Sequence, residues 1–418
     1  MVGVLEGVRV LVVGSGAREH ALAHSLRLDP SVTQVLCAPG NAGIAADTEC
    51  HPVVVTDPSA VADLAARLGI DLVVIGPESA LVAGVGDEVR RRGIASFGPT
   101  AAAARLEGSK AFAKDVMAGA GVPTARAAVC DSASDVVQAL DELGPPYVVK
   151  DDGLAAGKGV VVTPDRDDAV AHASSCGRVV VEEFLDGPEV SLFAVTDGVT
   201  VVPLQPAQDF KRVGDGDTGP NTGGMGAYSP LPWAPEGLVD EVVATVLQPT
   251  IDELARRGTP FAGLLYAGLA LTSRGVRVIE FNARFGDPET QVVLARLRSP
   301  LGQLLEAAAT GTLADHPPLQ WSPEAAVTVV LAADGYPADP RLGGVISGLD
   351  VAAKSPGAVV LHAGTAVDDA GNLISAGGRV LSVVGTGPTL AAARESAYEA
   401  ISCVHLRGSH YRTDIARW

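Results

Sequence analysis

The sequence predicts a multidomain α/β protein that begins with an open, parallel α/β sheet domain and ends with a small β-rich domain. At 418 residues the chain is too long for one hydrophobic core. Continuous apolar runs at 8–13 and 72–75, each followed by a glycine-containing turn, are typical of buried parallel strands. After residue 320, short apolar runs alternate with Ser, Gly and Pro turns, which favours β-structure. We therefore expect domains at 1–105, 106–319 and 320–418.

Composition limits the possible partners. The chain has 49 acidic and 31 basic residues, and its formal net charge of −18 argues against a nucleic acid partner. No stretch approaches the roughly 18 uninterrupted apolar residues of a membrane span, and the N-terminus lacks the basic and apolar segments of a signal peptide. The five cysteines form no CxxC pair, which fits reduced thiols better than disulfides or zinc. We expect a cytoplasmic protein with no membrane segment.

The first strand, 8–13, leads into a glycine turn and then an Ala- and Leu-rich helix pattern. Gly14 and Gly16 let the backbone approach an anion, and the start of the helix offers free N–H groups. A dinucleotide-binding fingerprint would need a third glycine where this chain has Glu19. This bulky carboxylate argues against a pyrophosphate, so a smaller phosphorylated ligand is the hypothesis that we keep.

The rest of the N-terminal domain continues the alternation of strands and helices. We expect strands at 34–38, 53–55 and 72–75, and a helix at 59–68. Ligands of open α/β sheets bind at the carboxyl ends of the strands, where the candidates here are Asn41, Gly76, Pro77 and Glu78. Each of them alone could equally be an ordinary turn residue.

A glycine-rich hairpin at 151–159 joins the predicted strands 147–150 and 160–163. Its backbone N–H groups can cradle phosphates. It is not a Walker A loop, because only three residues separate the glycines, Gly159 stands in place of Ser or Thr, and a strand follows. A mobile surface hairpin is the simpler reading, but it does not explain the lysines that flank it. A helix is expected to open at Ser109 and Lys110.

Two further segments of the central domain carry polar groups suited to a nucleotide or a substrate. The strand at 179–185 ends in paired acids, which can hydrogen-bond an adenine amino group, while Glu189 is placed for a ribose. The glycine-dense segment 210–226 has few strand signals, and loops this long inside a compact chain are usually functional or disordered. Its basic residues, with Asn221 and Thr222, favour substrate binding over a linker.

After a helix at 239–256 and a strand at 261–271, the strand ending near 282 carries the most informative pattern. Residues two apart on a strand share a face, so Glu280, Asn282 and Arg284 point the same way. Carboxylate and amide oxygens are ligands for Mg²⁺, and a guanidinium suits phosphoryl oxygens or a carboxylate. A solvated edge strand could explain one such residue but not three. The domain is expected to close with a helix at 294–310.

The last hundred residues show no clustered titratable groups. We expect strands at 326–332, 344–346, 359–362 and 380–384, followed by a helix from residue 390. This module is expected to pack against the other domains and close the pocket.

These motifs together resemble the glycinamide ribonucleotide synthetase family of the ATP-grasp ligases. The resemblance is carried by the segments 40–43, 106–110, 152–159, 211–226 and 280–291, and it runs nearly from end to end. It implies a central ATP-grasp domain with a mobile ATP-binding lid at about 124–190. It also implies the ATP-dependent ligation of glycine to 5-phosphoribosylamine through glycyl phosphate, in purine (IMP) biosynthesis, with Mg²⁺ or Mn²⁺ as the metal. The amidotransferase that makes phosphoribosylamine would be a partner for transient handover of this substrate.

The resemblance implies roles for individual positions. The metal ligands would be Glu280 and Asn282. The residues implied for ATP are Lys110, Lys150, Gly153, Gly157, Lys158, Gly159, Glu182, Glu183, Phe184, Leu185 and Glu189. Those for the other substrates are Gly14, Gly16, Arg18, Glu19, Asn41, Gly76, Pro77, Glu78, Asn221, Thr222, Gly223, Gly224, Met225 and Asp287. Those for catalysis are Arg284, Lys158 and Asp215.

Two features depart from the family pattern. Asp151 stands where a small residue is usual, and an added acid beside a phosphate flap should weaken ATP binding unless it faces solvent. The strand 261–271 offers no acid, so few carboxylates would serve the metal, which Mg²⁺ tolerates because phosphates and waters complete its shell. Three other functions remain as alternatives: another ATP-grasp ligase or carboxylase of purine synthesis, a nicotinamide oxidoreductase, and a nucleotide sensor without turnover.

Overall fold

The N-terminal domain is an open, fully parallel sheet in the order β3-β2-β1-β4-β5, as the sequence predicts. A computed structural model describes residues 7–154 and 159–417. Val10 and Val12 of β1 belong to one hydrophobic cluster, and Leu11 and Val13 belong to another. Both faces of this sheet are therefore covered, which explains the uninterrupted apolar run. The strands are β1 (Val8–Gly14), β2 (Val32–Pro39), β3 (Glu49–Cys50), β4 (Leu72–Ile75) and β5 (Ala95–Phe97). The helices are α1 (Ala17–Arg27), α2 (Ala42–Asp47), α3 (Pro58–Arg67), α4 (Glu78–Val82), α5 (Val85–Arg91) and α6 (Ala101–Gly108).

The strand predicted at 53–55 does not form. The third strand of the sheet is instead the two-residue β3, which Pro52 follows closely. Proline has no N–H for the ladder, so the pairing ends there.

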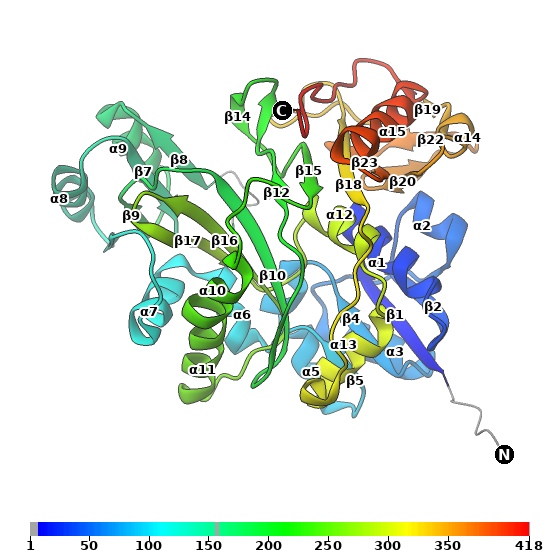
Figure 1. Cartoon of the computed structure of the whole chain (residues 1–418), viewed down its shortest axis with the longest axis horizontal. Coiled ribbons are helices and arrows are strands. Elements are labelled where there is room, and N and C mark those ends of the chain that lie inside the picture. Colours follow the sequence, from blue (N-terminus) through cyan, green and yellow to red (C-terminus); the bar gives the residue numbers. More distant parts are fainter. Residues whose placement is uncertain (1–6, 155–158, 418) are drawn as a thin grey trace.

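A small antiparallel sheet in the order β6-β9-β7-β8 lies at one end of the molecule, shown on the left of Figure 1 with α8 and α9. It has its own hydrophobic cluster, which includes Val149, Val179 and Val181. We call this unit the lid. Its elements are β6 (Ala127–Cys130), α8 (Ala133–Leu143), β7 (Tyr147–Asp151), β8 (Val160–Thr163), α9 (Arg166–Ser174) and β9 (Val179–Glu182). Helix α7 (Lys110–Ala120) precedes it, with the Ser109 hydroxyl capping its first turn at Phe112 N, 3.1 Å away.

The centre of the molecule is an antiparallel sheet in the order β11-β10-β16-β17 (Figure 1). Its strands are β10 (Glu189–Asp197), β11 (Val201–Pro203), β16 (Ala262–Thr272) and β17 (Gly275–Asn282). The helix predicted at 239–256 forms as α10 (Leu238–Val242), a π-helical turn at Val243–Leu247 and α11 (Gln248–Arg256).

The single helix predicted at 294–310 is wrong. Two helices occupy this region, α12 (Glu289–Arg296) and α13 (Leu301–Thr310), and a 3₁₀ turn at Leu313–Asp315 follows. The break falls before Pro300, because proline disfavours the helical conformation in the residue that precedes it. Arg298 N donates instead to Gln320 O, 2.9 Å away.

The C-terminal domain is built on a sheet in the order β12-β15-β18-β23-β20, at the upper right of Figure 1. Its elements are β18 (Ala325–Ala332), β19 (Ile346–Ser347), α14 (Leu349–Ala352), β20 (Ala358–His362), β21 (Thr365–Val367), β22 (Leu373–Ser375), β23 (Arg379–Gly387), α15 (Leu390–Ser402) and β24 (His405–Leu406). Two of its strands come from the central domain and flank the glycine-dense segment 210–226: β12 (Gln208–Asp209) and β15 (Gly226–Ser229). The segment itself was predicted to be strand-poor, but it holds the hairpin of β13 (Arg212–Gly214) and β14 (Thr218–Asn221).

Within the described residues, every helix is too short or too polar to cross a membrane.

Candidate active site

Glu19 folds back over the glycine turn at the start of α1. Its side chain is buried, and its Oε2 accepts a hydrogen bond of 2.6 Å from Gly16 N, while Oε1 lies 2.7 Å from Arg18 Nε. A Cβ added at Gly76 would lie 2.0 Å from Glu19 Oε1, and one at Gly14 would lie 2.5 Å from its Cγ. The carboxylate therefore fills the space above the ends of β1 and β4 that a pyrophosphate would need. This geometry argues against the nicotinamide alternative and shows that Glu19 is not in solvent.

Both polar atoms of the Asn41 side chain are hydrogen-bonded within the protein. Its Oδ1 accepts from Gly43 N and Ile44 N, at 3.0 and 2.9 Å, and caps α2. Its Nδ2 donates to Ser15 O at 2.8 Å and to His362 O of the C-terminal domain at 2.9 Å. In this conformation Asn41 fixes the loop between β2 and α2, and its amide hydrogens are already used.

Arg284 lies between two carboxylates from different parts of the chain. Its Nε lies 3.2 Å from Glu78 Oε2, and its Nη2 lies 3.0 Å from Glu107 Oε1. Burial raises the pKa of Glu107. Burial acts in the same direction at Glu78, but Arg284, Arg18 and hydrogen bonds together outweigh it and lower the pKa of that carboxyl. Arg284 and Arg18 both donate to Phe285 O, at 3.2 and 3.1 Å. The two guanidiniums thus meet at one carbonyl oxygen, at the junction of the N-terminal domain and the central sheet.

The metal-binding face predicted on β17 depends on a bulge. Gly268 pairs with Glu280 while Leu269 pairs with Val278, so Ile279 is an extra residue in the strand. The Ile279 carbonyl accepts from Lys150 Nζ at 3.0 Å. Beyond the bulge Glu280 and Asn282 are two apart and share a face, as predicted.

The surroundings of Glu280 fit a cation. Asp209 on β12 lies near three other acids, Glu189, Glu280 and Glu289, and near one lysine, Lys211. Burial, with Glu289, Glu189 and Glu280, raises the pKa of Asp209 to about 7 despite the opposing effect of Lys211. This excess of negative charge is what a divalent cation would offset. Among the described residues no group of three or more His, Cys, Asp or Glu side chains is arranged to hold a metal, so substrate oxygens would have to complete the shell.

On the lid side, Glu182 at the end of β9 bridges two lysines. Its Oε2 lies 2.9 Å from Lys150 Nζ, and its Oε1 lies 3.1 Å from Lys114 Nζ. Lys110 Nζ donates to Gly153 O at 3.0 Å, which joins α7 to the base of the glycine-rich hairpin. Burial lowers the pKa of Lys110 and of Lys114. Glu182 thus contacts Lys150, and Lys110 lies near enough to Lys150 to feel its charge, so these three predicted residues are brought to one region.

Four other residues predicted to bind ATP lie between β9 of the lid and the start of β10 in the central sheet. Glu183 accepts from Arg126 N at 3.0 Å and pairs with Arg274 Nη2 at 3.0 Å. These bonds outweigh burial and lower the pKa of Glu183 to about 2. Glu189 forms an ion pair with Lys211, and Phe184 has an exposed side chain. Leu185 is half-buried beside it.

The glycine-rich hairpin is described in part. Asp151 is half-buried at the end of β7, and its N–H donates to Gly159 O at 2.7 Å. Gly157 and Lys158 lie outside the described residues.

Asp287 is oriented by two side chains, one of them from the C-terminal domain. Gln291 Nε2 donates to its Oδ1 at 2.9 Å, and Arg379 Nη1 lies 3.3 Å from the same oxygen. Burial works against ionisation, but Arg379 and Arg18 outweigh it and lower the pKa of Asp287. Its Oδ2 lies 3.7 Å from the position of a Cβ added at Gly16, so it faces the N-terminal loop.

The segment 221–226 sits on the C-terminal sheet. Thr222 is buried, and its hydroxyl donates to Lys211 O at 2.8 Å and accepts from Gly224 N at 3.0 Å. Gly223 N donates to Tyr336 Oη at 2.9 Å. The Met225 side chain is fully buried, which leaves only its backbone for a ligand.

The side chain of Asp215, predicted to be catalytic, is held by the C-terminal segment. It lies in the turn between β13 and β14, and its Oδ1 accepts from Thr413 N at 2.8 Å. The hydrogen bonds of its side chain among the described residues are made with the C-terminal segment, so its predicted catalytic role gains no support from the geometry.

Sequence reasoning missed three charged residues of this region. Lys114 lies one helical turn after Lys110 on α7, and that spacing could have revealed it. Glu107 lies inside the motif 106–110 and could have been noted there. Arg379 follows two glycines in the C-terminal domain, and nothing in its sequence context points to a site.

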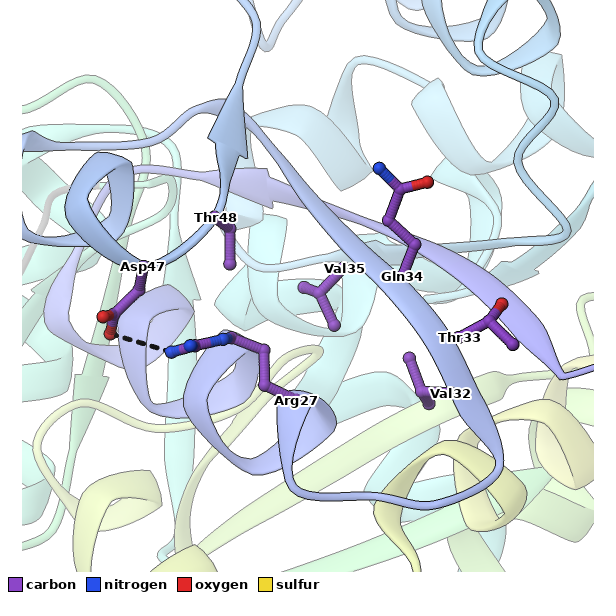
Figure 2. Close-up of a pocket in the computed structure, with 7 residues that line it drawn as sticks. All are labelled: Arg27, Val32, Thr33, Gln34, Val35, Asp47 and Thr48. Carbon is purple, nitrogen blue, oxygen red and sulfur yellow. Dashed lines mark ion pairs between the residues drawn. The ribbon is translucent and has the colours of Figure 1, made fainter.

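A cavity of about 240 Å³ lies away from all these residues, beside β2 (Figure 2). An ion pair of 3.2 Å between Arg27 and Asp47 borders it. The lining residues are Arg27, Val32, Thr33, Gln34, Val35, Asp47 and Thr48. None of the predicted site residues lines it, so it is not part of the candidate active site.

Comparison with protein families gives three matches in chain order. They are the N domain of phosphoribosylglycinamide synthetase at residues 8–107, its ATP-grasp (A) domain at 108–290 and its C domain at 326–418.

Individual relatives match over nearly the whole chain. A phosphoribosylamine–glycine ligase of Streptomyces coelicolor is 69% identical over 412 residues, covering 98% of this chain and 99% of that protein. The ligase of the same name from Mycobacterium tuberculosis is 59% identical over 417 residues, covering 98% of this chain and 97% of that protein. The crystal structure of the phosphoribosylamine–glycine ligase of Thermotoga maritima has a TM-score of 0.85 at 34% identity and covers 98% of this chain and 100% of that one. A biotin carboxylase of Campylobacter jejuni, with a TM-score of 0.73 at 14% identity over 97% of this chain and 93% of that one, shows a shared fold alone.

Proposed function

The chain belongs to the phosphoribosylglycinamide synthetase family, and on that premise we propose how it ligates glycine to 5-phosphoribosylamine. It is an ATP-dependent ligase of purine biosynthesis, and its products are glycinamide ribonucleotide, ADP and phosphate. The steps, the residues that perform them and the metal are our proposal.

One observation supports the proposal above all others: the eight residues 280–287 join the two halves of the site. Glu280 and Asn282 follow the bulged residue Ile279, whose carbonyl oxygen accepts a hydrogen bond from Lys150 on the side of the lid. Arg284 contacts Glu78, and Asp287 faces Gly16, on the side of the N-terminal loop. ATP bound under the lid and phosphoribosylamine bound at the N-terminal loop would thus meet along a single segment of chain.

The glycine carboxylate is a poor electrophile and has to be activated first. We propose that one of its oxygens attacks the γ-phosphorus of ATP, so that the bond to the β–γ bridging oxygen breaks and ADP leaves with glycyl phosphate formed. The amine of phosphoribosylamine then attacks the carbonyl carbon, the bond from this carbon to the phosphate oxygen breaks, and the nitrogen loses one proton. No covalent enzyme intermediate is needed.

On the ATP side, Lys110 and Lys150 would contact phosphate oxygens, and the segment from Glu182 to Leu185 would contact adenine. Lys150 is held in place by Glu182 and Ile279 O, which supports a fixed position for its charge. Glu280 and Asn282 would hold Mg²⁺ or Mn²⁺, which when bound supplies positive charge to the phosphate oxygens. Closure of the lid would exclude water, which otherwise hydrolyses an acyl phosphate.

On the other side, the loop at Gly14–Gly16 with the start of α1 would bind phosphoribosylamine. The helix start offers N–H groups to an anion, and Arg18 and Arg284 add two guanidiniums nearby. Asp287, ionised and facing Gly16, is placed to accept a hydrogen bond from the amine.

The cellular setting is also part of the proposal. All five cysteines lie in the described part of the chain and are free thiols, which supports a reducing, cytoplasmic location. We further propose that the amidotransferase that makes the unstable phosphoribosylamine hands it over transiently.

Phosphate release with each substrate omitted in turn tests the reaction. We expect rapid phosphate release only when ATP, glycine and phosphoribosylamine are all present. Without the amine, release should be slow or absent. Rapid release with bicarbonate in place of glycine would instead indicate a carboxylase of the same fold.

The intermediate is tested with glycine labelled with ¹⁸O in its carboxylate. If glycyl phosphate forms, one labelled oxygen has to appear in the released phosphate. Label that stays entirely in the product amide would exclude this route.

A further inference from the structure

Arg379 joins three segments that are far apart in the sequence. It begins β23, where it pairs with Ala332 of β18, so its backbone is part of the C-terminal sheet. Its Nη1 donates to Gly223 O at 2.6 Å and to Asp287 O at 2.9 Å. The same nitrogen lies 3.3 Å from Asp287 Oδ1. One guanidinium nitrogen thus holds the glycine-dense segment and Asp287 in a fixed relation.

The glycine-dense segment approaches these partners too closely for another residue type. A Cβ at Gly224, whose φ is +107°, would lie 2.4 Å from Pro288 Cδ. A Cβ at Gly223 would lie 3.0 Å from Arg379 Cζ. Tyr336 receives a hydrogen bond from Gly223 N, and so supports the segment from the C-terminal domain as well. Two side chains of the C-terminal domain, Arg379 and Tyr336, therefore hold Gly223.

We propose that Arg379 is a positioning residue for the phosphoribosylamine site, through which the C-terminal domain sets the place of segment 222–226 and of Asp287. The inference rests on the proposed function, because that function assigns these residues to substrate binding. Asp287 connects Arg379 to the N-terminal loop: its Oδ1 is held by Arg379 and Gln291, and its Oδ2 faces Gly16. Moving Arg379 would therefore move the oxygen presented to the N-terminal loop, whereas Lys110, Lys150 and Glu182 would stay where they are.

The test compares Arg379→Met and Arg379→Lys with a matched control, Arg394→Met. Arg394 is also in the C-terminal domain and also donates to backbone carbonyls, those of Thr413 and Ile415, but it contacts no predicted site residue among its described partners. For each variant we would measure the melting temperature and the KM for each of the three substrates. We expect Arg379→Met to raise the KM for phosphoribosylamine about tenfold or more, with the KM for ATP changed by less than about twofold.

Arg379→Lys keeps a cation that can reach the same carbonyl oxygens, so it should recover most of the affinity. Arg394→Met should leave all three KM values unchanged. If Arg379 only supports the fold, its substitution should raise the KM for all three substrates equally and lower the melting temperature. That result, unchanged KM values, or a rise confined to ATP or glycine would overturn the inference. Should Arg379→Met fail to fold, Arg379→Lys decides: a small rise in the KM for phosphoribosylamine alone, at an unchanged melting temperature, supports the inference, whereas no rise or equal rises for all three substrates overturn it.

The variant Gly16→Val shows whether a failure concerns the role of Arg379 or the proposed binding of phosphoribosylamine at the N-terminal loop. If Arg379→Met raises the KM for phosphoribosylamine and Gly16→Val does not, the inference stands and the place proposed for this substrate at the N-terminal loop fails. If Gly16→Val raises it and Arg379→Met does not, the inference fails and the proposed function stands.

Discussion

Arg284 Nη2 lies 3.0 Å from Glu107 Oε1, and this ion pair joins the segment that follows β17 to helix α6, which precedes the lid. Glu107 also accepts from Ala283 N at 2.8 Å, so both of its oxygens are used. Because Glu78 takes the other side of the guanidinium, the charge of Arg284 is already balanced by carboxylates in this conformation. A substrate anion would have to replace one of these partners. Glu78, whose side chain is the more exposed of the two, is the one we expect to be replaced.

Glu107→Gln tests this arrangement. The amide can still accept from Ala283 N, but it loses the charge that holds Arg284. We expect kcat to fall about tenfold to a hundredfold, and the free energy of unfolding to fall by about 1–3 kcal/mol, because a buried ion pair loses one partner. Steady-state kinetics and urea unfolding measure the two effects, with the exposed Glu236→Gln as a control. Unchanged kcat would show that Glu78 alone positions the arginine.

Glu280→Ala should abolish turnover while the fold survives. Glu280 is the one carboxylate of the proposed metal pair, and the loss of several kcal/mol of charge stabilisation corresponds to about a thousandfold or more in rate. Binding of adenosine should persist, because the residues proposed for adenine lie on β9 and after it. The measurement is turnover across a range of Mg²⁺ concentrations, beside nucleoside binding. Turnover near that of the unaltered enzyme in saturating Mg²⁺ would contradict the assignment.

Much of the site could be predicted because its parts are local in the sequence. The glycine turn before α1 and the alternation on β17 are properties of a few neighbouring residues, and both form where the sequence places them. The steric effect of Glu19 could be anticipated for the same reason, since Glu19 lies only three residues from Gly16.

What could not be predicted depends on contacts between distant segments. The bulge at Ile279 is a matter of register with β16, which the β17 sequence alone does not set. The pairing of β15 with β18 joins residues about a hundred positions apart, so the strand that ends the segment 210–226 gave no local signal. The importance of Arg379 comes from its contacts with Gly223 and Asp287, and no motif surrounds it in the sequence. The missed break before Pro300 is different, because the proline itself was a local signal.

Gly16→Val tests the N-terminal loop. The first added atom would lie 2.8 Å from Glu19 Oε2, so the carboxylate would have to leave its hydrogen bond with Gly16 N. We expect the KM for phosphoribosylamine to rise about tenfold or more, and those for ATP and glycine to change by less than about twofold. Gly177→Ala is the matched control, because a Cβ at Gly177 would meet nothing within 4 Å. A common rise for all three substrates would show that the loop is a folding element.

The interface between the N-terminal and C-terminal domains should weaken in acid, because it contains two histidines that are neutral in the folded state. His362 N donates to His20 Nδ1 at 2.8 Å, so this nitrogen of His20 has to be unprotonated. Burial lowers the pKa of His20, and burial with the nearby His20 lowers the pKa of His362 to about 4. An unfolded chain binds these protons near pH 6.5, whereas the folded chain does not bind the one on His362 until about pH 4.

Between these two pH values the unfolded state holds more protons, so the free energy of unfolding falls as the pH falls from about 6.5 to about 4. Above about pH 6.5 this contribution does not change with pH. For His362 the loss is at most about 2 kcal/mol at pH 5. We expect His362→Gln to lower the melting temperature at pH 7.5 through lost packing against Gly43, yet to lose less between pH 7.5 and pH 5 than the unaltered protein. The exposed His405→Gln should follow the unaltered protein at both values. If the pH dependence of His362→Gln is the same as that of the unaltered protein, His362 is not the group that makes the interface sensitive to acid.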